Sequence, residues 1–187
     1  MSDLERDEPR HHAQSRRRFL GSVAVAGAAM LGGARAFAAA PVRELGFLNL
    51  HTGERLRVPY WENGRYIRDA LAAIDHVLRD HRTNLVHAID TGLLDLLGRL
   101  QARVGNTRSF AVISGYRAPV TNAMLRARSH GVAQASMHLQ GKAIDIRLPG
   151  SELLGLHRAA VTLQGGGVGL YRASNFIHVD TGRVRYW

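Results

Sequence analysis

Two histidines and one aspartate are the residues whose types and spacing best suit metal chemistry. His138 and Asp145 are separated by seven positions, and His178 follows in a later segment. The chain has no cysteine, which excludes a thiolate zinc site, a disulfide and a cysteine nucleophile. Zinc then takes imidazole and carboxylate ligands, and a catalytic zinc keeps three protein ligands and one open position. The three residues are therefore candidate zinc ligands. The chain has ten histidines, so surface or satisfied core histidines remain an alternative.

The residues around His138 and Asp145 predict how these two side chains are positioned. We expect His138 on a loop and Asp145 inside a strand over residues 142–148, where apolar and polar residues alternate. Gly141 lies between them and allows a sharp backbone turn.

A second strand, predicted over residues 176–181, carries His178. Side chains two positions apart on a strand share a face, so Asp180 is expected to point the same way as His178. Asp180 therefore lies near whatever His178 binds.

The remaining elements follow from hydrophobic spacing and from turn residues. Further strands are predicted over 44–50, 55–60, 110–114, 168–171 and 183–187, and helices over 66–80, 89–104, 119–129 and 151–164. Asp90 or Thr91 can cap the second of these helices. Helices come first and paired strands gather late, which predicts an α+β fold. We expect an antiparallel sheet that carries a single zinc site and is packed by about four helices.

The first 38 residues have the composition of an export signal. Residues 15–20 read SRRRFL, a twin-arginine pattern, and the Ala/Gly-rich run 20–33 is shorter than the roughly 20 residues that span a bilayer. Small residues near Ala38 and Ala40 offer two cleavage sites. We predict a cleaved or flexible twin-arginine signal over 1–38 and one domain over 41–187. The mature protein is expected to be periplasmic and monomeric, without a stable membrane anchor.

The positive net charge of the chain indicates which binding partners are favoured. The net charge is +10, and +8 of it lies after residue 38. A basic domain favours polyanions such as nucleic acid, anionic lipid or carboxylate-rich peptidoglycan, although a solvated basic surface without a partner is the alternative. Export removes nucleic acid as a partner, and no aromatic-plus-basic motif supports it.

Three separated motifs then indicate a family. The segment S-x-H-x-x-G-x-A-x-D at 136–145 and the H-x-D at 178–180 resemble the zinc D-Ala-D-Ala carboxypeptidase superfamily, which includes VanX, VanY and the hedgehog signalling domain. More closely, residues 44–187 resemble the YcbK/MepK-like murein endopeptidases. The matching stretches are NLHTGERL, YWENGRYI, LRDHRTN, ISGYRAP, SHGVAQASMHLQGKAIDIRLPG, GGGVGLY and FIHVDTGRVRYW.

The resemblance implies roles for individual residues. One Zn²⁺ per chain would be held by His138, Asp145 and His178. Arg117, in the segment SGYR, would bind the developing oxyanion or a substrate carboxylate, with a structural ion pair as the alternative. Supporting roles fall to Ser136, through hydrogen bonding to the site or substrate, and to Gly141, through the backbone.

One position departs from the superfamily pattern. Its dipeptidase members carry a general-base glutamate three residues before the last histidine ligand, and this chain has Asn175 there. An amide cannot take a proton from water. Asp180 is the candidate base, and its alternative role is to orient the imidazole of His178.

The implied function is zinc-dependent hydrolysis of peptide bonds in peptidoglycan stem peptides or cross-links during cell-wall remodelling. One alternative is a D,D- or L,D-carboxypeptidase that trims terminal D-amino acids. Another is a non-catalytic peptidoglycan-binding protein with a structural zinc site. A groove for substrate can involve Tyr116, His130, Tyr171 and Trp187, although each of these residue types is more often found in a core or on a surface.

Overall fold

The computed structural model describes residues 41–128 and 133–187. The predicted signal at 1–38, the predicted helix end at 129 and His130 lie outside the described residues. Within the described part, no helix is both long enough and apolar enough to cross a membrane.

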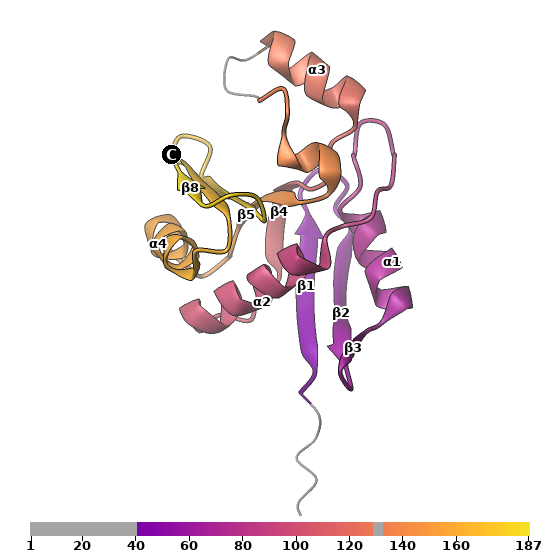
Figure 1. Ribbon diagram of the computed structural model, residues 1–187, viewed down its shortest axis with the longest axis vertical. Helices are drawn as coiled ribbons and strands as arrows, with labels where there is room; N and C mark the ends of the chain where they lie inside the picture. Colours follow the sequence, from indigo (N-terminus) through magenta and orange to yellow (C-terminus); the bar gives the residue numbers. More distant parts are fainter. Residues whose placement is uncertain (1–40, 129–132) are drawn as a thin grey trace, which may run out of the picture. The chain divides into compact units, whose positions relative to one another are not determined.

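The strands of the described residues form one eight-stranded sheet (Figure 1). In space their order is β3-β2-β1-β4-β5-β7-β6-β8. Their bounds are β1 Arg43–Asn49, β2 Arg55–Glu62, β3 Arg65–Tyr66, β4 Phe110–Ser114, β5 Ala143–Arg147, β6 Gly167–Tyr171, β7 Phe176–Asp180 and β8 Arg185–Tyr186.

The sheet is mixed, so the prediction of an antiparallel sheet is only partly right. The pairs β1–β4 and β6–β8 are parallel, and the other neighbouring pairs are antiparallel. The connection from β1 to β4 contains two helices, which is the long crossover that a parallel pair requires. Strands β7 and β8 lie on opposite sides of β6, so the chain reverses twice and β8 runs parallel to β6.

Four α-helices occur in the described part of the chain, as predicted for an α+β fold. They are α1 Arg68–Val77, α2 Thr91–Val104, α3 Pro119–Arg128 and α4 Leu153–Leu163, and a 3-10 helix, η1, covers Met137–Gln140. Their termini follow local chemistry. The Asp90 carboxylate accepts a hydrogen bond from the Gly92 amide at the start of α2, and Gly105 ends that helix in the left-handed conformation, with φ 64°.

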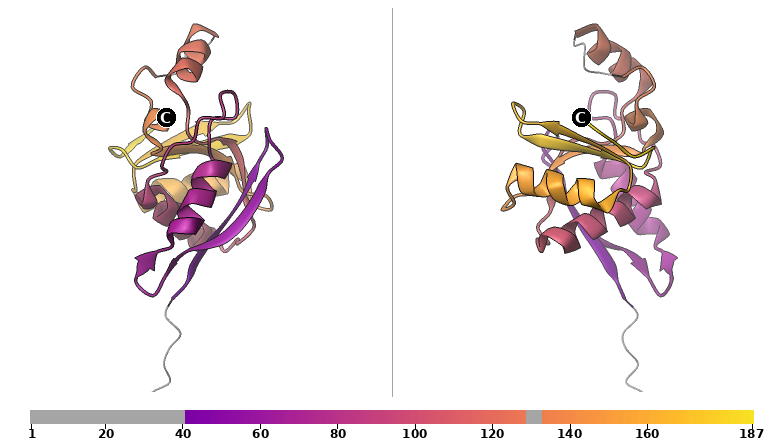
Figure 2. Two further views of the ribbon diagram at one scale, coloured as in Figure 1. Left: turned by 90° about the vertical axis from the view of Figure 1, so that its right-hand side faces the viewer. Right: turned by 60° about the vertical axis from the view of Figure 1, so that its left-hand side comes forward.

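The hydrophobic core lies between one face of the sheet and helices α1, α2 and α4 (Figure 2). Helix α2 contributes a stripe of leucines at helical spacing, Leu93, Leu94, Leu97 and Leu100, which are fully buried. Helix α3 stands apart from this core (Figure 1), and its buried side chains are the polar Thr121 and Asn122. Three of the four helices therefore pack the sheet.

Strand register gathers the candidate ligands on the opposite face of the sheet. Asp145 of β5 lies directly across from His178 of β7, and Gly169 of β6 pairs with His178 on its other side. Paired residues and residues two apart share a face, so Asp180 lies on the same face as His178. Val179, between them, faces the core.

Candidate metal centre

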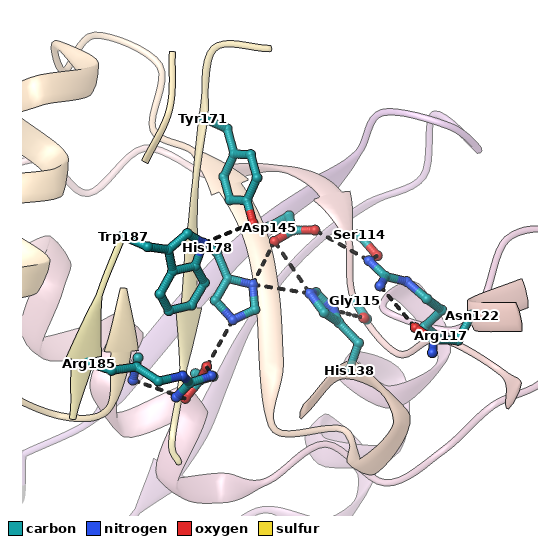
Figure 3. Close-up of polar contacts among 12 residues, drawn as sticks. Ser114, Gly115, Arg117, Asn122, His138, Asp145, Tyr171, His178, Arg185 and Trp187 are labelled. Carbon is teal, nitrogen blue, oxygen red and sulfur yellow. Dashed lines mark hydrogen bonds and ion pairs between the residues drawn. The ribbon is translucent and has the colours of Figure 1, made fainter. Parts of the chain in front are cut away.

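The three predicted ligands converge on one point from three different elements (Figure 3). His138 Nε2 and His178 Nδ1 are 3.2 Å apart, and Asp145 Oδ1 lies 3.3 Å from the first and 2.9 Å from the second. Two ligands about 2.0–2.1 Å from a tetrahedral zinc ion are themselves about 3.3 Å apart. The three donor atoms are thus spaced as three corners of such a tetrahedron.

Hydrogen bonds on the far side of each imidazole fix which nitrogen carries the proton. His138 Nδ1 lies 2.7 Å from the Gly115 carbonyl oxygen, and His178 Nε2 lies 2.9 Å from Asp180 Oδ2. Both partners are acceptors, so in the neutral rings these outer nitrogens donate and the inner nitrogens present lone pairs. Two lone pairs and one carboxylate oxygen facing each other suit a cation, and the residues therefore fit a divalent metal ion.

The electrostatics of Asp145 agree with this donor set. Burial would raise the pKa of the Asp145 carboxyl, but His138 and His178 outweigh burial and hold the pKa well below its usual range. The carboxylate is therefore ionised at neutral pH and available as a ligand.

Local backbone structure places His138. The prediction of a loop here is wrong, because His138 lies on the 3-10 helix η1 and is 2% exposed. Gly141 follows η1 with φ 65°, and a Cβ at this position would collide with the carbonyl oxygen of Ala88. The turn between the two ligands thus requires glycine for both conformation and space.

Asp180 is enclosed in a network behind His178. Its side chain is fully buried, and besides His178 its oxygens accept hydrogen bonds from the backbone amides of Gly167 and Gly182, at 3.0 and 2.8 Å. Arg185 adds two further bonds, at 3.1 and 2.6 Å. Burial would raise the pKa of Asp180, but the bonds from His178, Arg185 and the two amides hold it well below its usual range.

Arg117 lies on the other side of the ligands. Its Nη2 is 3.6 Å from Asp145 Oδ2, and its hydrogen bonds to Asn122 Oδ1 and Ser114 Oγ are long, at 3.3 and 3.4 Å. The buried Nε has no partner among the described residues. Burial lowers the pKa of Arg117, an effect that Asp145 partly opposes. The guanidinium thus retains donor capacity beside the ligands.

A cavity of about 410 Å³ opens onto these groups. It is lined by Arg117, Ala133, Ala135, Ser136, Met137, His138, Asp145, Tyr171, Phe176, His178, Arg185 and Trp187. Two of the possible groove residues, Tyr171 and Trp187, line it. Tyr116 instead stacks on His87, with ring centroids 4.6 Å apart.

Sequence reasoning missed Arg185 and Phe176. Arg185 lies on β8, where its pairing with Gly167 places it on the site face. The alternation of Arg185 and Trp187 in the predicted strand over 183–187 was the available signal, but the sequence did not show how this strand pairs with its neighbour. Asn175, which stands where the dipeptidases have the general-base glutamate, lies in the turn between β6 and β7 with φ 53°. It lines a different cavity from the one that contains the three candidate ligands.

Among the described residues, the candidate site is one buried His-Asp-His cluster on a face of the sheet, and it opens to a cavity that Arg117 and Arg185 also line. Three potential metal ligands beside room for a substrate are typical of metal-dependent hydrolases.

Comparisons with known proteins specify the family. The family described as "Peptidoglycan L,D-endopeptidase MepK" matches residues 37–187, and the chain belongs to this family. The Peptidoglycan L,D-endopeptidase MepK of Escherichia coli strain K12 is 45% identical over 139 residues, 74% of this chain and 76% of the relative. The Probable peptidoglycan L,D-endopeptidase MepK of Haemophilus influenzae is 44% identical over 146 residues, 78% of each chain. No solved structure matches significantly.

Proposed function

We propose that this protein is a zinc-dependent peptidoglycan endopeptidase that hydrolyses peptide bonds in the cell wall. The family and the relatives support a peptidase that acts on peptidoglycan. The observation that carries the zinc assignment is the triangle of donor atoms, 2.9–3.3 Å on each side, formed by His138, Asp145 and His178. Zinc bound there would polarise the scissile carbonyl and activate water near neutral pH.

Arg117 is proposed to bind the developing oxyanion or a substrate carboxylate rather than to serve as a structural ion pair. Its separation of 3.6 Å from Asp145 and its long hydrogen bonds leave donors for a ligand. A preorganised guanidinium stabilises negative charge that develops in a transition state. Ser136, which lines the same cavity and is 9% exposed, is proposed to support the substrate.

For Asp180 we propose the orienting role rather than that of general base. A base must come within about 2.6–3.2 Å of the proton that it takes, directly or through one water. Asp180 instead contacts His178 Nε2, the ring nitrogen that faces away from the other two ligands, and its oxygens already accept bonds from Gly167, Gly182 and Arg185. The carboxylate therefore fixes the tautomer and angle of the imidazole.

The bond cut is proposed to be an L,D peptide bond, as the names of the relatives state for those proteins. Peptidoglycan lies outside the cytoplasm, so we also propose that the protein is exported to the periplasm through the twin-arginine signal at 1–38. The basic domain suits a substrate rich in carboxylates.

Digestion of purified peptidoglycan sacculi tests this function. The protein is expected to release soluble muropeptides, EDTA is expected to stop the release, and added Zn²⁺ is expected to restore it. Mass spectrometry separates the reactions: cleaved cross-links indicate an endopeptidase, and loss of one terminal residue indicates a carboxypeptidase. Unchanged digestion with the chelator would contradict zinc dependence, and bound metal without any product would indicate a binding protein.

A further inference from the structure

Tyr171 is one of the residues that line the cavity at the candidate metal centre. It lies on β6 and lines the same cavity as the three ligands and Arg117. Figure 3 shows its hydroxyl directed towards Asp145. Register sets Tyr171 opposite Phe176, and the two rings stack with centroids 4.5 Å apart and an interplanar angle of 14°. The ring therefore has a defined orientation.

A hydrogen bond from Trp187 determines what the phenol can do. The indole Nε1 lies 3.1 Å from the Tyr171 oxygen, and an indole N–H can only donate. The phenol oxygen is thus the acceptor, and its own hydrogen is available for another partner. Among the described residues, none accepts a hydrogen bond from Tyr171.

The backbone around Trp187 holds the indole in place. The Trp187 amide donates to the Val168 carbonyl at 3.2 Å, and the Trp187 carbonyl accepts from the Leu170 amide at 2.9 Å. Gly169 leaves room for the ring, because a Cβ there would lie 2.6 Å from the indole. Two backbone hydrogen bonds therefore hold the main chain of Trp187, and its indole, which donates to the Tyr171 hydroxyl, packs closely against Gly169.

We infer that Tyr171 is a catalytic residue whose O–H donates a hydrogen bond to the scissile carbonyl oxygen as negative charge develops on it. This inference rests on the proposed function. Hydrolysis of an amide builds charge on that oxygen, and a preorganised donor stabilises the transition state more than the ground state. Besides Arg117, Arg185 also lines the cavity, but its guanidinium is hydrogen-bonded to Asp180.

The variant Tyr171→Phe tests the inference, because it keeps the stacked ring and removes only the O–H. The substrate is a set of cross-linked muropeptides released from sacculi by a muramidase. Losing one oxyanion donor is expected to lower kcat by about 100-fold or more, with KM changed less than about threefold. Zinc content measured by atomic absorption is expected to match the wild type.

Tyr186→Phe is the matched control, because the Tyr186 hydroxyl donates to the Val161 carbonyl outside the cavity. It is expected to retain wild-type kcat. Wild-type kcat in Tyr171→Phe would overturn the inference and leave the proposed function standing. Reduced zinc content in Tyr171→Phe would also overturn it, since the residue would then act through the metal site. If the zinc-loaded wild type gives no product, the proposed function fails and the inference fails with it.

Discussion

Replacing Asp180 with asparagine separates the two roles considered for this residue. The wild-type carboxylate presents one oxygen to the amides of Gly167 and Gly182 and the other to His178 Nε2. Asparagine has one acceptor oxygen. If that oxygen stays on the amides, the NH₂ group faces His178 and favours the tautomer with its proton on Nδ1, the nitrogen that is needed as a ligand. If the oxygen faces His178, the NH₂ group opposes two backbone donors.

The structure sets the size of the expected effect. Removing the partner that orients a metal-binding histidine typically lowers metal affinity by about 10–100-fold, or about 1.4–2.7 kcal/mol. Asp180 is fully buried, and each amide orientation either disfavours the ligating tautomer of His178 or opposes two backbone donors, so we expect the upper part of this range. An orienting residue affects zinc affinity first, and kcat at saturating zinc should stay within about tenfold of the wild type.

Zinc titration with a competing chelator measures the affinity, and muropeptide hydrolysis at saturating zinc measures kcat. Asp95→Asn is the matched control, because Asp95 is a partly buried carboxylate that accepts bonds from Arg43, Tyr60 and Tyr66 away from the cavity. It is expected to leave zinc affinity unchanged. If Asp180→Asn kept wild-type zinc affinity but lost far more than tenfold in kcat, the orienting role would be refuted and a general base supported.

Two further changes test the positioning of the ligands. His178→Ala removes a ligand itself and is expected to lower zinc affinity by more than about 100-fold, whereas the exposed His76→Ala is expected to change nothing; equal affinities by chelator competition would contradict the assignment. Gly53→Ala and Gly141→Ala both place alanine at positive φ, which costs about 1–2 kcal/mol, but only at Gly141 does the new Cβ also meet backbone. Urea denaturation is therefore expected to show the larger loss for Gly141→Ala, and equal losses would indicate that the loop relaxes.

The sequence was most informative where chemistry and periodicity coincided. The strands that carry Asp145 and His178 were predictable because each alternates, and alternation correctly placed Asp180 on the face of His178. The leucines of α2 were predictable from their helical spacing. The resemblance then connected His138 to these strands, which spacing alone left open.

What could not be predicted depends on contacts between segments distant in sequence. Alternation shows which face of the sheet Asp180 occupies. Its hydrogen-bond donors Gly167 and Arg185, however, lie on β6 and β8, and no single segment of the sequence encodes the order of the strands. The same holds for Trp187, whose contact with Tyr171 requires β8 to run parallel to β6. The 3-10 helix at His138 is held by contacts outside its own four residues, which local propensity does not reveal.

The proposed function joins one zinc site to cleavage within the peptides of the cell wall. Its most direct test is a titration of zinc into metal-free protein, with cross-linked muropeptides as substrate and mass spectrometry of the products. We predict that cleaved cross-links, each with the mass of one added water, rise with zinc and level off at one equivalent per chain. The same cleavage by metal-free protein, or a plateau reached without cleavage of any cross-link, would contradict the proposed function.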